Sequence, residues 1–112
     1  MAPPEVHKAL GPGLLESAYE ACLCHELHLR GVAFETQIEL PITYKGVELD
    51  CCYRMDLVVS KEVVVEIKSI EHTLAIHEAQ LMSYLKISGY RAGLLINFNV
   101  ALLKDGIIRR VL

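Results

Sequence analysis

Apolar residues recur at helical spacing in two segments of the chain. Between positions 14 and 30 they lie three and four residues apart on one side, while Glu20 falls on another face. Gly31 is a typical residue at the end of such a helix. The second helix is expected from Thr73, which can cap its first turn, to about Ser88. The pattern predicts two helices separated by a long segment of different character.

The segment between these helices alternates apolar and polar residues, as strands do. Residues 34–40 show this alternation, and a turn at Lys45-Gly46 leads to a second strand that ends at Val59. Residues 60–62 form the next turn. The run from 63 to 68 is almost continuously apolar, which is typical of a central strand covered on both faces.

Two more strands are expected after the second helix. Residues 92–98 have the character of a buried strand, whereas residues 107–112 are few and predict a marginal one. The order is helix, three or four strands, helix, strand and a short last strand. An α/β sandwich with a mixed sheet satisfies it. With 112 residues and no repeat or linker, we expect a single domain over positions 1–112.

Composition narrows the class of protein. Hydrophobic residues make up 53% of the chain and charged residues 22%, which is typical of a folded globular protein. The longest uncharged apolar runs are far shorter than the roughly 20 residues of a membrane helix, so we expect no membrane span. The N-terminal residues lack the basic and apolar regions of a secretory signal. A cytoplasmic location is therefore expected.

The four cysteines match neither a CxxC pair nor a usual zinc spacing; they are Cys22, Cys24, Cys51 and Cys52. The first two point in different directions on a helix, and the last two face opposite sides of a strand. We therefore interpret them as buried free thiols rather than as a metal site or a disulfide framework.

Three charged residues interrupt the apolar strands. Asp56 precedes the turn at 60–62, and Glu66 and Lys68 end the strand after it. Alternate side chains share a face of a strand, so Glu66 and Lys68 point the same way, and pairing of the two strands brings Asp56 near Glu66. Burying these charges is costly unless something compensates, and a divalent metal with oxygen ligands would do so. The alternative is a surface ion pair of small energy.

The net charge of −3 argues against a protein that binds nucleic acid through a broad basic surface. It does not argue against a metal-dependent nuclease, because bound ions supply positive charge at the phosphate. In such a site Lys68 could orient or deprotonate a water, or stabilise charge on the phosphate.

Four short motifs occur in order along the chain: Gly13-x-x-Glu16-x-x-Tyr19, Asp56, Glu66-x-Lys68 and Gln80-x-x-x-Tyr84. Together they resemble the GxxExxY family, a branch of the PD-(D/E)XK nuclease superfamily, over essentially the whole chain. The resemblance implies an αβββαβ restriction-endonuclease-like core, with a mixed β-sheet flanked by helices, and metal-dependent cleavage of DNA phosphodiesters. Met55 stands where the superfamily name has a proline.

The resemblance also implies roles for individual residues. Asp56 and Glu66 are similar to the metal ligands of the superfamily, with the backbone carbonyl of Ile67 as a further ligand. Lys68 resembles the catalytic lysine. Glu16 resembles the helical acid, which serves as a ligand through water or as an aid to a second ion.

Residues of the second helix resemble the QxxxY motif of RecB-type nucleases. The motif residues, here Gln80 and Tyr84, orient the active site and contact DNA. His77 lies on the same helical face and is a candidate for substrate contact, or else a partly exposed helix histidine. Arg54 is a candidate for binding phosphate or for balancing Asp56.

Other polar residues have simpler interpretations. His7 is expected to have a solvent or helix-capping role, with metal binding as the alternative. Tyr19 is expected in the core, where its hydroxyl could hold a carboxylate in place. Four basic residues are expected to be solvated surface; they are Lys86, Arg91, Arg109 and Arg110.

The leading hypothesis is a small nuclease in which Mg²⁺ or Mn²⁺ activates water for attack on a DNA phosphate. The first alternative is a catalytically silent module of the same fold that binds nucleic acid or a protein partner. A nuclease that acts on RNA is a third hypothesis. A homodimer is expected if the product is a double-strand break, because one small domain cuts one strand.

Overall fold

Three α-helices and a five-stranded sheet form the fold in the computed structural model, which describes residues 2–112 apart from the side chains at positions 50–52. The helices are α1 (Ala2–Leu10), α2 (Glu16–Leu29) and α3 (Ala75–Ser88). The strands are β1 (Phe34–Tyr44), β2 (Val47–Val59), β3 (Val63–Lys68), β4 (Ala92–Asn97) and β5 (Ile107–Val111), and a short 3₁₀ turn η1 (Leu103–Gly106) precedes β5.

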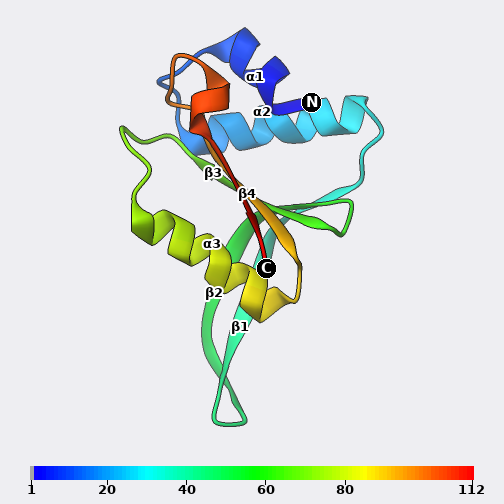
Figure 1. Cartoon of the computed structure of the whole chain (residues 1–112). Coiled ribbons are helices and arrows are strands. Elements are labelled where there is room, and N and C mark those ends of the chain that lie inside the picture. The colour runs from blue at the N-terminus through cyan, green and yellow to red at the C-terminus, as the bar shows by residue number, and fades with distance from the viewer. Residues whose placement is uncertain (1) are drawn as a thin grey trace.

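The sheet is mixed, and its strands lie in the order β1-β2-β3-β4-β5. Antiparallel hairpins join β1 to β2 and β2 to β3. β3 and β4 are parallel, and α3 connects them across one face of the sheet, as such crossovers require (Figure 1). The order of elements confirms the αβββαβ core of an α/β restriction-endonuclease-like fold, with α1 added before it and β5 after it.

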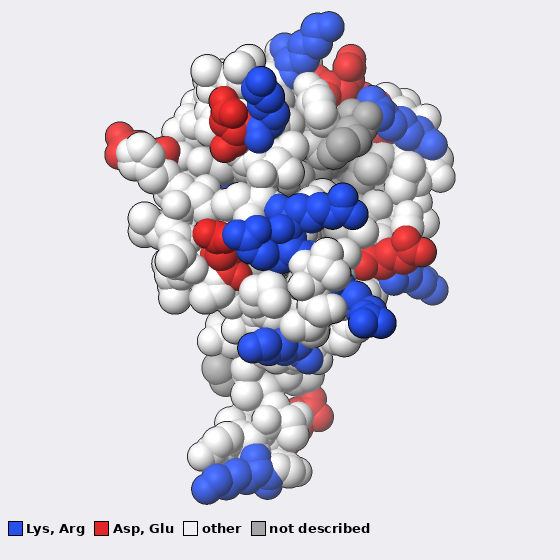
Figure 2. All heavy atoms as spheres, in the orientation of Figure 1, with Lys and Arg blue, Asp and Glu red and all other residues white. Residues whose placement is uncertain are grey.

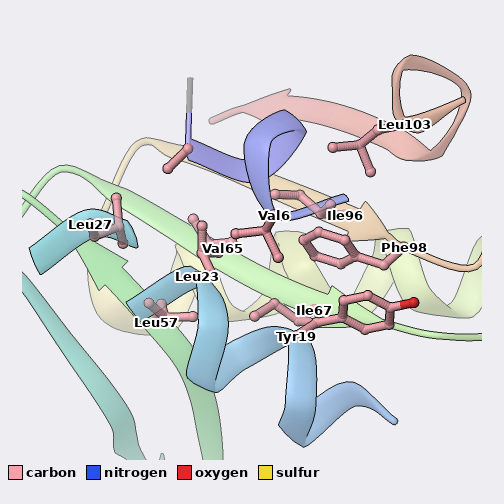
Figure 3. Packing of buried hydrophobic residues seen from close by; sticks show 11 residues of the cluster. Val6, Tyr19, Leu23, Leu27, Leu57, Val65, Ile67, Ile96, Phe98 and Leu103 are labelled. Carbon is pink, nitrogen blue, oxygen red and sulfur yellow. The ribbon is translucent and has the colours of Figure 1, made fainter. Parts of the chain in front are cut away.

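Helices cover both faces of the sheet (Figure 1). On one face, α1 and α2 pack against the strands through a cluster of buried apolar side chains (Figure 3) that includes Val6, Leu23, Leu27, Val65, Ile67 and Phe98. On the other face, Leu81 and Leu85 of α3 pack with Val64 and Leu95. β3 contributes to both clusters, which confirms its expected place as a strand covered on both faces.

Tyr19 closes the first of these clusters and is fully buried. Its ring stacks on that of Phe98, with 4.5 Å between centroids and 11° between planes (Figure 3). Its hydroxyl donates to the carbonyl of Gly11 at 2.5 Å and accepts from the N–H of Leu14 at 3.1 Å. The expected core position is confirmed, but the hydroxyl fixes the loop before α2 instead of holding a carboxylate.

Both predicted hairpin turns are present. Lys45 and Gly46 have φ of 50° and 80°, and Ser60 and Lys61 have φ of 53° and 55°. Two consecutive positive φ angles are the geometry of a type I′ turn, which matches the twist of antiparallel strands. These turns determine which residues of β1, β2 and β3 lie opposite one another.

The β1–β2 hairpin extends well beyond the body of the molecule (Figure 1). We call its outer part, residues 41–52, the arm. Within it the pairing of the two strands shifts register between Pro41 and Ile42. Tyr44 and Val47, at the end of the arm, leave 61% and 59% of their surface exposed. The described side chains of the arm, at positions 41–49, therefore add surface without adding buried residues to either core cluster.

The N-terminal segment differs from the expectation. Residues 2–10 form α1, in which Ala2 and Val6 are buried in the core. His7 is only 8% exposed, and its Nε2 lies 2.8 Å from the carbonyl oxygen of Val100, in the loop after β4. The expected solvent or capping role of His7 is wrong, because its ring joins α1 to the far end of the chain.

Three further expectations need correction: the N-cap of α3, the marginal character of β5 and the solvated position of Arg110. The N-cap of α3 is Leu74 and not Thr73, and the backbone N–H of Leu74 donates to Nδ1 of His77 at 3.0 Å. β5 pairs with β4 over five consecutive positions and is not marginal. Arg110, on β5, forms an ion pair with Glu78 of α3 and is therefore more than a solvated surface residue.

Of the cysteines, Cys22 is exposed and Cys24 is half-buried, so the expectation of buried thiols is wrong for Cys22. Burial, followed by the charge of Glu20, raises the pKa of the Cys24 thiol. The side chains of Cys51 and Cys52 lie outside the described residues. Among the helices described between residues 2 and 112, none combines the length and apolar character that crossing a membrane requires.

Candidate active site

β2 and β3 part at Asp56 and Glu66. Their last ladder pair is Leu57 opposite Val65, so Asp56 and Glu66 occupy the next opposed position. At this position, hydrogen bonds to side chains take the place of the backbone hydrogen bonds between the strands. The N–H of Asp56 donates to Glu66 Oε1 at 3.1 Å, and the N–H of Ile67 donates to Asp56 Oδ2 at 2.8 Å. The two carboxyl groups are thus fixed beside each other on rigid strands, as the sequence predicts.

Glu66 is buried and Asp56 is half-buried. Glu66 is 5% exposed, and its burial, followed by the charge of Asp56, raises its pKa to about 8. Burial is also the largest cause that raises the pKa of Asp56. The pair therefore titrates as a coupled unit that retains a proton at neutral pH when no cation is bound.

Lys68 lies two residues after Glu66 on the same face of β3 and is half-buried. Its positive charge lowers the pKa of both Asp56 and Glu66, but less than burial raises them. Within the described part of the chain, no carboxylate lies within ion-pair distance of its ammonium group. The lysine is therefore near the acids without being neutralised by either.

Glu16, the first residue of α2, faces the end of β3. Its Oε1 accepts from the backbone N–H of Ser69 at 3.4 Å, and the Ser69 hydroxyl donates to the carbonyl of Leu14 at 2.5 Å. The charge of Glu16 also contributes to the raised pKa of Asp56. The structure brings the helical acid to the same end of the sheet as the strand acids.

Glu20 is a further acid near the site that the sequence did not single out. Its charge raises the pKa of Asp56 more than that of Glu16 does. Both of its carboxylate oxygens accept from Nε2 of Gln37, at 2.9 Å and 3.1 Å. Since Glu16 and Glu20 are four residues apart on α2, their i, i+4 spacing was a usable signal.

The segment that follows Lys68 is held by Asn97, which is 2% exposed at the end of β4. Its Oδ1 accepts from the N–H of Ile70 at 3.2 Å, and its Nδ2 donates to the carbonyl of Ile70 at 3.0 Å. These bonds fix the exit of β3 and with it the direction of Lys68. The pattern of apolar and polar residues gave no signal for this role, because in the sequence Asn97 is only the last residue of an apolar strand.

Residues of α3 line a pocket of about 470 Å³ beside Lys68. The pocket lining contains the predicted stripe of His77, Gln80 and Tyr84, together with Tyr53, Lys68, Ile76, Ala79 and Ser83. Tyr84 is 4% exposed, and burial, followed by the charges of Glu66 and Asp56, raises its pKa to about 12. The tyrosine hydroxyl therefore remains protonated and can donate a hydrogen bond.

His77 and Arg54, the two other candidates for substrate binding, lie in different parts of the structure. The Nδ1 of His77 accepts from Leu74, so this ring caps α3 as well as lining the pocket. Arg54 lies on the exposed side of β2, where its guanidinium is 3.8 Å from Glu39 Oε1 on β1. Arg54 is not among the charges that shift the pKa of Asp56. Its expected role in balancing Asp56 is not supported.

The donor set is suited to a hard divalent cation. A half-buried and a buried carboxyl group, both with raised pKa, lie together, and a bound cation would favour their ionised forms. The strand geometry offers a carbonyl as well. The carbonyl of Lys68 accepts from the N–H of Phe98, the residue after β4, so the N–H and C=O of Ile67 face the gap beside β2. Over residues 2–112 as described, no group of three or more Asp, Glu, His or Cys side chains is arranged to hold a metal.

Comparison with known proteins gives one match. The model of the PD-(D/E)XK nuclease superfamily matches residues 2–111, which is nearly the whole chain. No curated protein and no solved structure matches. The matched region contains both strand acids, Lys68, the α2 acid and the α3 stripe, and nucleases of this superfamily generally use divalent metals. On this match and this fold, the chain belongs to the PD-(D/E)XK nuclease superfamily.

Proposed function

We propose that the protein is a metal-dependent nuclease that hydrolyses phosphodiester bonds of DNA. The observation that carries the proposal is the pair of carboxyl groups of the half-buried Asp56 and the buried Glu66, fixed where β2 and β3 part and next to Lys68. A purely structural ion pair would not need two acids facing each other in an apolar sheet, since the charge of Asp56 raises the pKa of Glu66.

Asp56 and Glu66 would hold Mg²⁺ or Mn²⁺ together with the carbonyl of Ile67, and Glu16 would assist through water. Bound there, the cation would lower the pKa of a water and polarise the phosphate. Lys68, which has no carboxylate partner among the described residues, would donate to a phosphate oxygen or orient the attacking water. Gln80 and the protonated hydroxyl of Tyr84 line the adjoining pocket and can position the substrate by hydrogen bonds.

DNA binding would not depend on a broad basic surface. The net charge is −3, and Figure 2 shows Lys and Arg side chains across the middle of one face and at the end of the arm, with Asp and Glu between them. A bound cation and Lys68 would supply positive charge where the phosphate lies. Two copies of the chain would provide two such sites for a double-strand break.

The second candidate is a module of the nuclease fold that binds without turnover. The specific observation in its favour is that only two carboxyl groups converge, with no third Asp, Glu, His or Cys arranged around them in the described chain. The presence of Lys68 beside Asp56 and Glu66 favours the nuclease.

The test is cleavage of linear, circular, single-stranded and branched DNA with and without Mg²⁺ or Mn²⁺. We expect metal-dependent cleavage by the wild type, a loss of about 100-fold or more in Asp56→Asn, Glu66→Gln and Lys68→Ala, and wild-type rates in Lys86→Ala, an exposed α3 lysine. Metal binding without cleavage of any DNA would favour the silent module. RNA cleavage in place of DNA cleavage would overturn the choice of substrate.

A further inference from the structure

Tyr53 lies at the base of the arm, beside the candidate active site, and the mechanism above does not use it. Its ring centroid is 5.8 Å from that of Tyr84, with the planes inclined at 56°. Tyr84 is almost completely buried, whereas Tyr53 leaves 45% of its surface exposed. The two tyrosines therefore form an aromatic pair in which only Tyr53 is exposed to solvent.

Tyr53 and Tyr84 line the same pocket as Lys68. The pocket volume of about 470 Å³ lies within the range of small-ligand sites, about 300–1,000 Å³. Ile76 and Ala79 add apolar lining, while Gln80 and Ser83 supply hydrogen-bonding groups. An aromatic surface with a few polar groups suits a planar heteroaromatic ring with a polar edge.

We propose that this pocket binds an unpaired nucleobase, which stacks on Tyr53 while Lys68 contacts the phosphate of the same strand. The proposal rests on the proposed nuclease function and specifies its substrate class as DNA with unpaired nucleotides, in single strands, flaps or frayed ends. Every base has a π-face, so stacking is tolerant of sequence. A base inside a duplex is covered by its neighbours on both sides and cannot stack on the tyrosine without leaving the helix.

The polar lining supports the same occupant. Nδ1 of His77 accepts from the N–H of Leu74, so a neutral ring carries its proton on Nε2. His77, Gln80 and Ser83 can therefore offer both donors and acceptors to the edge of a base. Because the chain carries a net charge of −3, stacking would supply binding that a basic surface does not provide.

The experiment measures binding of a fluorescent single-stranded oligonucleotide and of its duplex with Ca²⁺ replacing Mg²⁺. We expect Tyr53→Ala to weaken single-strand binding about tenfold and to leave duplex binding unchanged, whereas Tyr53→Phe, which retains the ring, binds as the wild type does. Tyr44→Ala is the matched control, because Tyr44 is an exposed tyrosine at the far end of the same arm. Melting temperatures of all variants establish that each is folded.

A second measurement is made on the substrate. Abasic sites are placed one by one along the single strand, and we expect one position to weaken wild-type binding as much as Tyr53→Ala does, with no further loss when the two changes are combined. Equal binding by Tyr53→Ala and the wild type, or equal losses in Tyr44→Ala, would overturn the proposal. If the wild type cleaves DNA with metal but the Tyr53 variants behave alike, only this inference fails. If the wild type neither binds nor cleaves DNA, the proposed function fails as well.

Discussion

At the scale of single residues, the site depends on two acids that the fold places opposite each other. Each of Asp56 and Glu66 accepts one backbone N–H from the other strand, which fixes their positions but does not offset the loss of hydration. Burial is the largest cause of the raised pKa of both groups, and the charge of Asp56 raises the pKa of Glu66 further. The metal-free protein therefore has a specific dependence on pH.

We expect the metal-free protein to lose stability as the pH rises from about 5 to 8. The pKa of Glu66 is 4.5 ordinarily and about 8 in the folded chain. Between these values the folded state binds a proton that the unfolded state does not, so the free energy of unfolding falls with pH until Glu66 is ionised in both. Thermal unfolding in EDTA should give a wild-type Tm at pH 5.5 at least about 5 °C above that at pH 8.

The matched variants isolate this contribution. Glu66→Gln cannot titrate, so its Tm should change less between the two pH values than that of the wild type. Glu62→Gln, at an exposed position in the β2–β3 turn, should retain the wild-type profile. Parallel profiles for the wild type and Glu66→Gln would show that Glu66 is not the group responsible.

The site residues that the sequence predicted and those that it missed differ in what determines their position. Asp56, Glu66 and Lys68 were identifiable because charges within apolar strands stand out in the pattern. Tyr53 lies beside Lys68 only because β2 and α3 pack together at that end of the sheet. Such proximity depends on tertiary packing, which spacing along the chain does not record.

At the scale of elements, the separation of β2 and β3 creates the gap for the site, and the start of α2 borders it. The start of α2 is fixed through Tyr19, whose hydroxyl bonds both the carbonyl of Gly11 and the N–H of Leu14. The Ser69 hydroxyl then joins Leu14 to the end of β3. The position of Glu16 therefore depends on a hydroxyl in the core.

We expect Tyr19→Phe to lower the free energy of unfolding by about 1–2 kcal/mol, because the stacking on Phe98 is kept while two part-buried hydrogen bonds to the backbone are lost. Urea denaturation measures it, with Tyr44→Phe on the exposed arm as the control. Nuclease activity should fall with the stability loss but not vanish, since Glu16 itself is retained. Stability equal to the wild type would mean that the loop is fixed by other contacts.

Most of the elements were predictable from local signals. The change of period from helix to strand, the turn at Lys45-Gly46 and the end of the second helix at Ser88 all agree with the structure. α1 was missed because its nine residues include Pro3 and Pro4, which suggest irregular structure although proline is favoured at the start of a helix. The pairing of β5 was underestimated because it depends on β4 and not on its own length.

At the scale of the whole molecule, the chain offers one candidate site, with the arm extending away from it (Figure 1). A double-strand break would then need two copies. Sedimentation velocity at the concentrations of the cleavage assay should show a dimer of the 12.5 kDa chain if linear duplex is cut on both strands. A monomer that cuts both strands in one encounter would contradict this assembly.

The central claim is that the carboxyl groups of Asp56 and Glu66 hold the divalent cation of a nuclease. The most direct measurement is anomalous diffraction from crystals soaked in Mn²⁺, with crystals of Glu66→Gln as the control. We expect an anomalous peak within bonding distance of both carboxylates and the Ile67 carbonyl, and a weaker or absent peak in Glu66→Gln. A wild-type crystal with no peak there, or with its only peak elsewhere, would contradict the claim.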